Sequence, residues 1–562
     1  MALTSYINWR VTTGGTEANG GGFDPSLTTN MLTDGAATSA TGASPVFSSA
    51  SYNFVAGDVG AYLYIASGTN WTPGWYPIVS VAANAATLDA DVTTNRGGAL
   101  LANKTVLTTT GCATTASPTG ATFSIDYTPL NTAPVSASDL TSTASTTMTS
   151  ATGGFTKVMI GNTVKLTSGS GTTPGYYSIT NRTDTNTITV DRSSGTYTAG
   201  VFKVGGAHAS LVNYSNGGTG LPTPAVATPL AAGHTIWMKG AGNENPSASD
   251  YDYDAGYWTF PAGSSTAGWI KIIGYNGRPQ IDYSGLLIYN SAYFHILYLC
   301  PKQNAATSTT YGFLSSGRSV ASHCRFDQNG YDAVQHAGAA FDCYFKNGGS
   351  TTAGTAYAWT GTNQYPSILI GNVFENIRGG AIRDASGLSY IANNIIRNCK
   401  GTATAGILLD ASTYGSIIYG NTIDNGAGDA IRLSDADVIA STVIRNNIIS
   451  NHAGSGKFGI NCSVGTTALN DALIIDKIDY NDLYANTTDR NNHSAGIHDK
   501  AVDPTYTDSA SGDYSIGTNL KESGFPNTFP NGASTAYIDI GGVQRQEPAG
   551  GSGGLNAFGF AQ

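Results

Sequence analysis

The 562-residue chain has little charge: 11% of its residues are Asp, Glu, Lys or Arg, and it contains few glutamates. A helical protein of this length would contain many more Glu and Lys, which are strong helix formers, so an all-α fold is excluded. The formal net charge is −10, and basic residues are not clustered. The chain therefore lacks the basic face that nucleic acid or an anionic membrane surface requires, and we predict neither as a partner.

Long apolar runs and cysteine motifs are missing as well. No stretch approaches the roughly 18 consecutive apolar residues of a membrane-spanning helix. Residues 1–10 contain neither a basic start nor an apolar run, so we expect no signal peptide in them. The six cysteines form no C-x-x-C pair, which disfavours zinc and redox sites and favours burial as small apolar residues.

The chain is instead rich in Gly, Thr, Ser and Asn, which is typical of short strands separated by turns. One long segment occurs twice: Phe54-x5-Gly60 followed by the sequence PGWYPI matches Phe155-x5-Gly161 followed by PGYYSI. Both copies alternate apolar and polar residues, which predicts two small β modules. Their aromatic residues either stack on carbohydrate or form the cores of the modules. The residues proposed for carbohydrate binding are Trp71, Trp75 and Tyr176.

A second repeat occupies the C-terminal half of the chain. Seven segments share an Asn or Cys, a β-branched, aliphatic or aromatic residue two positions later, and in most cases an amide two positions after that. They begin at Cys324, Cys343, Asn372, Asn394, Asn421, Asn447 and Asn481. Their internal period is 2, and a Gly-rich turn and a second apolar strand follow most of them. Strands this short must stack coil on coil, which predicts a parallel β-solenoid.

Like residues then lie over like residues, about 4.8 Å apart, so the Asn side chains can form a hydrogen-bonded ladder at a coil corner. In this interpretation Cys324 and Cys343 replace Asn in the ladder. With these residues the chain resembles the right-handed parallel β-helix, or pectin-lyase-like, superfamily, which includes polysaccharide lyases, polysaccharide hydrolases and bacteriophage tailspikes. The segments 10–23, 234–240, 269–279 and 503–541 are similar to the first strand, early coils and closing segments of such proteins.

The predicted fold class is therefore all-β, a right-handed parallel β-helix with two small tandem β modules inserted near the N-terminus. The predicted domains are a first strand and cap (1–29), module 1 (30–130), module 2 (131–225), the β-helix (226–500), and closing strands with a Gly-rich tail (501–562).

The resemblance also implies where catalysis would take place, because pectate lyases use Ca²⁺-binding aspartates and an arginine base on an outer sheet. The nearest matches are Arg383, Asp384, Asp410 and Asp435. If Gly380 aligns with Gly406, Asp384 and Asp410 lie side by side, close enough to share a proton, bind a cation or act as a retaining glycosidase pair. A shift of one residue places Asp384 beside Leu409 instead, and the sequence leaves both registers open. We predict no cofactor, although such a pair could bind Ca²⁺.

Three hypotheses for function remain, since a β-helix serves both enzymes and scaffolds. The first is a bacteriophage virion protein (capsid decoration, fibre or spike), a homotrimer in contact with other virion proteins. The second is a polysaccharide depolymerase, either a lyase or a glycoside hydrolase. The third is a secreted bacterial protein that binds carbohydrate. A cell-surface polysaccharide is a possible partner. The expected location is the virion, with the extracellular space as the alternative, and the hypothesis of a non-enzymatic protein is preferred.

Overall fold

The computed structural model of the protein contains two compact units, Met1–Asp282 with Tyr293–Cys300, and Tyr283–Ala292 with Pro301–Gln562. The residues that the structure describes are 8–13, 15–16, 18, 32–39, 44–54, 62–72, 74–83, 85–88, 112–113, 118–126, 135–155, 163–214, 230–241, 243, 246, 249–253, 258–275, 277–283, 288–289, 292–303, 313–314, 318–327, 334–335, 338–348, 357–361, 366–410, 414–474, 476–528 and 535–544.

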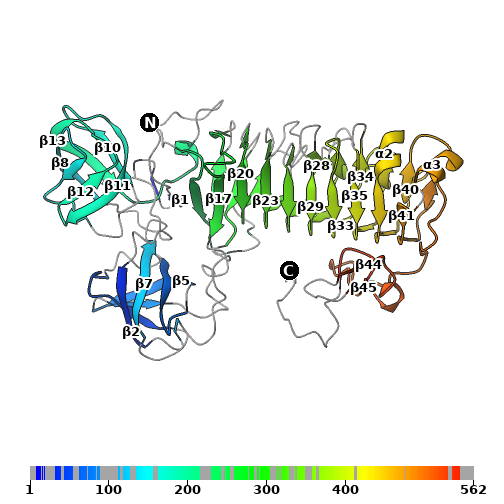
Figure 1. Ribbon diagram of the computed structural model, residues 1–562, viewed down its shortest axis with the longest axis horizontal. Coiled ribbons are helices and arrows are strands. Elements are labelled where there is room, and N and C mark those ends of the chain that lie inside the picture. The colour runs from blue at the N-terminus through cyan, green and yellow to red at the C-terminus, as the bar shows by residue number, and fades with distance from the viewer. Residues whose placement is uncertain are drawn as a thin grey trace. The chain divides into compact units, whose positions relative to one another are not determined.

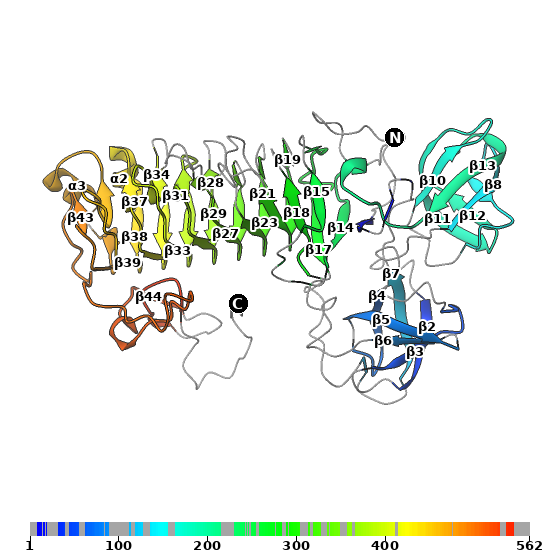
Figure 2. The same ribbon diagram turned by 180° about the vertical axis from the view of Figure 1, so that it is seen from behind.

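The first unit contains two closed antiparallel barrels (Figure 2). The strands of the first are β2 (Leu32–Ser39), β3 (Val46–Ser48), β4 (Tyr62–Thr69), β5 (Gly74–Ala82), β6 (Ala85–Leu88) and β7 (Thr119–Asp126). Those of the second are β8 (Val135–Thr143), β9 (Thr147–Thr149), β10 (Thr163–Ser168), β11 (Gly175–Asp184), β12 (Thr187–Val190) and β13 (Thr196–Val204). Both barrels have the same circular strand order. Tyr76 Oη donates to Thr72 O (2.7 Å) and Tyr177 Oη to Thr173 O (2.6 Å), so the duplication extends to single hydrogen bonds.

The two barrels are inserted between adjacent strands of one sheet. Strand β1 (Asn8–Val11) pairs in parallel with β14 (Thr235–Lys239), which in turn pairs with β17 (Ile270–Tyr275) and then β20 (Phe294–Leu297). The coils before β23 also contain β15 (Tyr251–Tyr253), β16 (Trp258–Thr259), β18 (Gln280–Tyr283), β19 (Ile288–Tyr289), β21 (Cys300–Gln303) and β22 (Phe313–Leu314), and η4 (Val212–Tyr214) follows the second barrel. The insertion after the first strand that the resemblance implied is therefore present.

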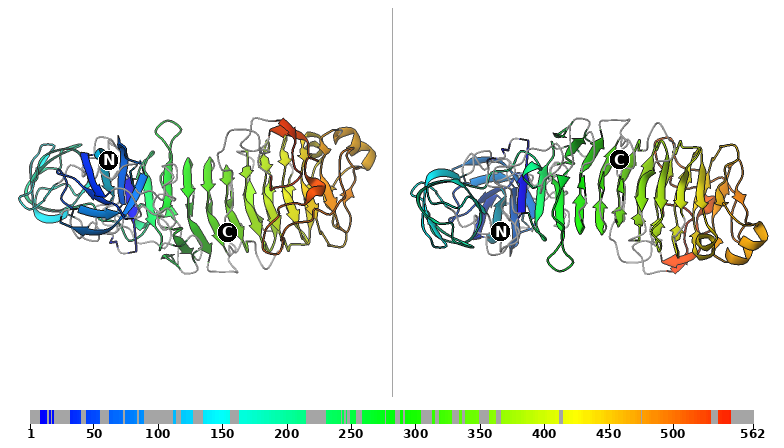
Figure 3. Two further views of the ribbon diagram at one scale, coloured as in Figure 1. Left: turned by 90° about the horizontal axis from the view of Figure 1, so that it is seen from below. Right: turned by 90° about the horizontal axis from the view of Figure 1, so that it is seen from above.

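The second unit is a stack of coils with three parallel sheets (Figures 1 and 3). Sheet 1 contains β23 (Ser319–Ser322), β26 (Ala339–Phe341), β29 (Ile368–Ile370), β32 (Tyr390–Ala392), β35 (Ile417–Tyr419), β38 (Val443–Arg445) and β41 (Ile478–Asp479). Sheet 2 contains β24 (Arg325–Asp327), β27 (Tyr344–Lys346), β30 (Val373–Glu375), β33 (Ile395–Arg397), β36 (Thr422–Asp424), β39 (Ile448–Ser450) and β42 (Asp482–Tyr484). Sheet 3 contains β25 (Val334–Gln335), β28 (Tyr357–Gly361), β31 (Gly380–Asp384), β34 (Ala405–Leu409), β37 (Asp429–Leu433), β40 (Ile460–Cys462) and β43 (Arg490–Asn491). The helices α2 (Ala436–Ser441) and α3 (Thr467–Ile474) belong to late coils.

The interior of this stack is a column of like side chains. Phe326, Phe345 and Phe374 occupy equivalent positions of three successive sheet 2 strands, and their rings stack at 4.9 and 4.6 Å between centroids, within 6° of parallel. The column continues with buried Ile396, Ile423, Ile449 and Leu483. Each coil thus removes its apolar surface from water against the coils on either side, which is the main favourable term for a fold of such short strands.

The asparagine ladder between sheets 1 and 2 is present. Each side-chain amide donates to Oδ1 of the asparagine in the next coil at 2.9 Å, from Asn372 through Asn394, Asn421 and Asn447 to Asn481. All five side chains are fully buried. Cys343 and Cys324 precede them: Asn372 Oδ1 accepts the Cys343 backbone N–H at 2.9 Å, and Cys324 O accepts that of Tyr344. Buried amides are thereby satisfied along the whole stack, as the sequence predicted.

The second amide of the repeat has a conformational role that the sequence did not reveal. These residues have φ between 53° and 59°: Asn347, Asn376, Asn398, Asn425 and Asn451. Asn tolerates this left-handed region better than other residues with a Cβ atom, and it is needed where the chain turns out of each sheet 2 strand. Their side chains also bond to one another, as Asn425 Nδ2 does to Asn398 Oδ1 at 2.7 Å.

A stack of hydroxyl residues was missed by the sequence reasoning. Ser367, Ser389, Ser416 and Thr442 each precede the first residue of a sheet 1 strand, and all four are buried. The backbone N–H of Ser367 donates to Ser389 Oγ (3.1 Å), and that of Ser389 to Ser416 Oγ (3.2 Å). Hydroxyls are common in this chain, so the spacing becomes visible only once the strands are aligned.

The described residues of the closing segment, 501–528 and 535–544, include several that contact the outer face of sheet 2. Tyr514 Oη donates to Asp424 Oδ2 at 3.0 Å, and the Gly542 backbone N–H donates to Thr422 Oγ1 at 2.9 Å. The segment includes η5 (Thr518–Leu520), β44 (Pro526–Thr528) and β45 (Thr535–Tyr537). Its Ile516, Leu520 and Ile540 form a small apolar cluster with Ile448 of β39.

The predicted fold class, an all-β right-handed parallel β-helix that carries two small tandem β modules, is confirmed. All six cysteines are free and buried, as expected from their spacing. Among the residues described, no helix is both long and apolar enough to cross a membrane.

Candidate functional site

The register around Asp384 is the one that places it beside Leu409. Strands β31 and β34 pair Ile382 with Ile407 and Arg383 with Leu408. Side-by-side alignment of Asp384 and Asp410 would require the other register. The carboxylates of Asp384 and Asp410 are therefore not aligned on neighbouring strands.

Asp384 is fully buried among serines. Its carboxylate accepts hydrogen bonds from the hydroxyls of Ser386 (2.5 Å), Ser389 (2.6 Å) and Ser367 (2.8 Å). Burial raises the pKa of Asp384, and the three hydroxyls act in the opposite direction. The carboxylate thus fixes the turn between β31 and β32.

The other predicted catalytic residues also have local partners. Asp410 Oδ2 accepts hydrogen bonds from Arg383 at 2.6 and 3.0 Å, and this ion pair is partly exposed. Asp435 is the N-cap of α2, where its side chain accepts the Asp437 backbone N–H at 2.8 Å. The catalytic assignment of these residues stays a prediction, and the structure gives each of them a conformational role.

The aromatic residues proposed to bind sugar lie in the barrels. Trp71 is buried in a barrel core, where its Nε1 donates to Thr119 O at 3.3 Å. Tyr176 is also buried, with its ring edge-on to Trp9 at 5.5 Å between centroids. The Trp75 side chain lies outside the described residues. Both rings are buried: Trp71 belongs to the core of the first barrel, while Tyr176 packs against Trp9 of β1 and is not part of a barrel core.

An exposed apolar row on sheet 1 was not predicted. Ile368, Tyr390 and Ile417 are in register on β29, β32 and β35, and 38%, 36% and 36% of their surface is exposed. Leu388 and Tyr414, in the turns before these strands, are 69% and 52% exposed, and the Leu388 N–H donates to Tyr414 O at 2.6 Å. We call these five residues the sheet 1 row. Aligning the first residue of each strand would have revealed it, but strand ends cannot be placed to one residue from sequence.

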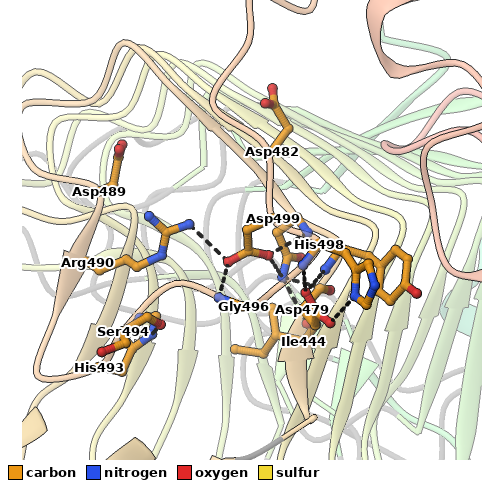
Figure 4. Close-up of polar contacts among 12 residues, drawn as sticks. Ile444, Asp479, Asp482, Asp489, Arg490, His493, Ser494, Gly496, His498 and Asp499 are labelled. Atoms are coloured by element: carbon orange, nitrogen blue, oxygen red, sulfur yellow. Dashed lines mark hydrogen bonds and ion pairs between the residues drawn. The ribbon is translucent and has the colours of Figure 1, made fainter.

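Polar side chains gather at the last coil (Figure 4). Asp499 ends the asparagine ladder: its Oδ1 accepts the Asn481 backbone N–H at 2.9 Å, as each asparagine does for the preceding one. Its Oδ2 accepts hydrogen bonds from Gly496 N and from Arg490 Nη2, both at 2.9 Å. A carboxylate suits this position, because the last rung needs acceptors and has no further coil to which it could donate.

His498 and Asp479 form a dyad beside this end of the ladder (Figure 4). His498 Nδ1 lies 2.8 Å from Asp479 Oδ2, while Asp479 Oδ1 accepts the backbone N–H groups of Tyr480 (2.9 Å) and His498 (2.7 Å). The imidazole stacks on the Tyr480 ring at 4.3 Å and 12°. Its orientation is thus fixed by a hydrogen bond and by a ring contact.

Asp482 is a buried carboxylate with an unsatisfied atom. Its Oδ1 accepts the Val502 backbone N–H at 2.9 Å, whereas Oδ2 has no hydrogen-bond partner among the described residues. Burial, with smaller contributions from Asp489 and Asp503, raises its pKa to about 6. Figure 4 shows it directed away from the Asp499 carboxylate, so the two acids do not form a pair.

Metal ligands do not converge in the described part of the chain. No group of three or more His, Cys, Asp or Glu side chains there could hold a metal ion. His493 is buried, with Nδ1 2.9 Å from Ser494 O, and burial lowers its pKa.

The comparisons with known proteins agree with the fold. The family described as "Periplasmic copper-binding protein (NosD)" matches residues 322–524, about a third of the chain. The residues described there offer no cluster suited to copper. No curated protein sequence matches the chain.

Three solved structures are similar to it. Pectate lyase Pel9A is 11% identical, covers 56% of this chain and 89% of its own, and has a TM-score of 0.36. A mutant of the periplasmic alginate epimerase AlgG is 14% identical over 50% of this chain and 69% of its own, with a TM-score of 0.27. A PL6 family polysaccharide lyase from Pseudopedobacter saltans is 13% identical over 50% of this chain and 86% of its own, with a TM-score of 0.25. Likenesses at this level say nothing about what this chain binds or cleaves.

Proposed function

We propose that this parallel β-helix protein binds a polysaccharide outside the cytoplasm, along the sheet 1 row. The observation that carries the proposal is the register of Ile368, Tyr390 and Ile417 on three successive coils. The row advances by about 4.8 Å per coil, close to the advance of an extended glycan per sugar unit. A glycan lying along the coils would therefore meet the same kind of surface at each unit.

The composition of the surface supports a glycan as its occupant. The row contains no charged residue, and tyrosines present both an apolar ring face and a hydroxyl. The Arg383–Asp410 ion pair, at the end of sheet 3 in the same coils, adds planar polar groups that can bond to hydroxyls. Contiguous exposed apolar residues on a folded protein mark an interaction site.

Backbone strain at Leu388 of the row also supports a role in binding. Leu388 has φ of 56° and is mostly exposed, although a bulky residue with a Cβ atom is costly in this conformation. The Asp384–serine network and the bond to Tyr414 O hold the turn in place. Strain kept at an exposed position is common at binding sites.

The location is proposed from the family match. The NosD description names a periplasmic protein, which favours the secreted or periplasmic alternative over the virion hypothesis. The virion hypothesis and the depolymerase activity gain no support from the contacts described above. Assembly as a homotrimer remains a proposal, and light scattering that finds a monomer at micromolar concentration would contradict it.

Retention in native gels that contain bacterial or plant polysaccharides tests the binding proposal. We expect at least one glycan to retard the protein, and the double variant Tyr390→Ala, Tyr414→Ala to lose most of that retardation. Leu469→Ala is the matched control, since Leu469 is an exposed apolar residue on α3, outside the row. Equal retardation of all three proteins would refute binding at the row.

A further inference from the structure

The His498–Asp479 dyad lies at the end of the sheet that carries the row. Asp479 occupies β41, and its position continues the register of Tyr419 on β35 and Arg445 on β38. Ile417 of the row lies on the same strand as Tyr419. A chain bound along the row and extended over two more coils would therefore reach the dyad.

The dyad has the arrangement of an oriented base. With Nδ1 bonded to Asp479, Nε2 is the ring nitrogen left to accept a proton, and about half of the His498 side chain is exposed. Nε2 has no hydrogen-bond partner among the described residues. A carboxylate behind one ring nitrogen fixes the tautomer and stabilises the imidazolium formed when the other nitrogen accepts a proton.

The residues around the dyad restrict the positions of the His498 and Asp479 side chains more than is usual for an exposed ion pair. Tyr480 adopts a φ of 60°, the left-handed conformation that earlier coils also have at this turn, there with Tyr298, His323, Asp342, Asn393, Gly420 and Asn446. A Cβ atom at Gly496 would come within 2.5 Å of Asp479 Oδ1, so only glycine allows this approach. Both features preserve the position of the imidazole at a conformational cost.

We propose that His498 is a general base that activates water for hydrolysis of an ester substituent, such as an O-acetyl group, on the bound glycan. The location of the substrate rests on the proposed function, while the chemistry rests on the dyad alone.

The steps balance with water as the sole co-reactant. Nε2 accepts a proton from water as the water oxygen bonds to the acyl carbon. The bond from the acyl carbon to the sugar oxygen then breaks, and the sugar oxygen takes the proton from Nε2. The products are a carboxylic acid and a free sugar hydroxyl, and Asp479 stays ionised throughout.

Other reactions fit the surroundings less well. Cleavage of a glycosidic bond uses two carboxyl groups, and Asp479 already accepts three hydrogen bonds. Proton removal from a sugar acid needs a cation to neutralise the substrate carboxylate. The nearest candidate, Arg445, is engaged with Asp476 O and lies 4.3 Å over the Phe525 ring.

Ester hydrolysis by the full chain tests the proposal, with p-nitrophenyl acetate and an acetylated polysaccharide as substrates. We expect His498→Gln to reduce the rate about 100-fold or more, which is the usual contribution of a general base, and Asp479→Asn to reduce it as well. Melting temperatures should stay close to that of the wild type for His498→Gln, since the side chain is half exposed.

His323→Gln is the matched control, because His323 lies in the equivalent turn of an earlier coil with a looser 3.7 Å contact to Asp342. Its rate should equal that of the wild type. Equal rates for wild type and His498→Gln would overturn the proposal. If the protein binds no glycan but its ester hydrolysis still depends on His498, the role of His498 as a base is supported. Only the proposal that glycan binds at the sheet 1 row is then refuted.

Discussion

The middle coils and the last coil of the second unit have different kinds of residue at equivalent positions. In the middle coils, Asn or Gly occupies the left-handed turn after sheet 1, and Ile448 or Thr422 lies beneath the closing segment. In the last coil the equivalent positions hold Tyr480 and Asp482. The last coil thus breaks local preferences that its neighbours satisfy.

Some residues of the last coil differ from their equivalents because this coil ends the stack. A terminal repeat has no further coil to cover it, so its composition differs. Asp499 is explained in this way, since it accepts the final hydrogen bonds of the ladder. Capping does not explain the half-exposed His498 that stacks on the Tyr480 ring and bonds to Asp479. Departures without a structural reason are where function is expected.

The largest expected effect comes from breaking the regular region. Asn421→Leu would leave the Asn394 backbone N–H without its acceptor and would remove one hydrogen bond each from Asn394 Nδ2, Asn447 Oδ1 and Ile391 O, all inside the stack. A stranded buried group costs about 1–3 kcal/mol and each further lost bond about 1 kcal/mol, so we expect the free energy of unfolding to fall by more than about 3 kcal/mol. Urea unfolding measures this change.

The matched control for that substitution is Asn425→Gly, at an exposed left-handed turn where glycine fits. Its stability should stay within about 1 kcal/mol of the wild type. Equal effects of the two substitutions would mean that the ladder does not carry the stability of the stack.

The features of the fold that recur in every coil could be predicted from the sequence, and the features that occur once could not. Stacking of Asn372 to Asn481 follows from a pattern with period 2 inside each unit, because like side chains must lie over one another. The register of Asp384 could not be predicted, since it depends on the length of one Gly-rich turn. The dyad was missed because Asp479 and His498 are distant in sequence and meet through an irregular loop, where no period applies.

A smaller effect is expected where the last coil buries a carboxylate. The pKa of Asp482 rises from its ordinary 3.8 to about 6 in the folded protein, because burial disfavours the ionised form. The native state therefore loses stability as the pH rises from about 4 through about 6, by up to about 3 kcal/mol. Asp482→Asn keeps the acceptor for Val502 N–H and removes the charge.

We therefore expect Asp482→Asn to be more stable than the wild type at pH 7 and close to it at pH 4. Urea unfolding at the two pH values measures the difference. A variant less stable than the wild type at pH 7 would show that the charge of Asp482 is compensated in the native state.

The smallest effect is expected at the strained turn of the row. Leu388→Asn places a residue that tolerates positive φ at a position where Leu is exposed, so the free energy of unfolding should rise by about 0.5–1 kcal/mol. Glycan retardation should fall at the same time, because an apolar contact is lost. Thermal unfolding and native gels on one preparation measure both changes. A variant that is more stable and still fully retarded would mean that Leu388 is strained for a reason other than binding.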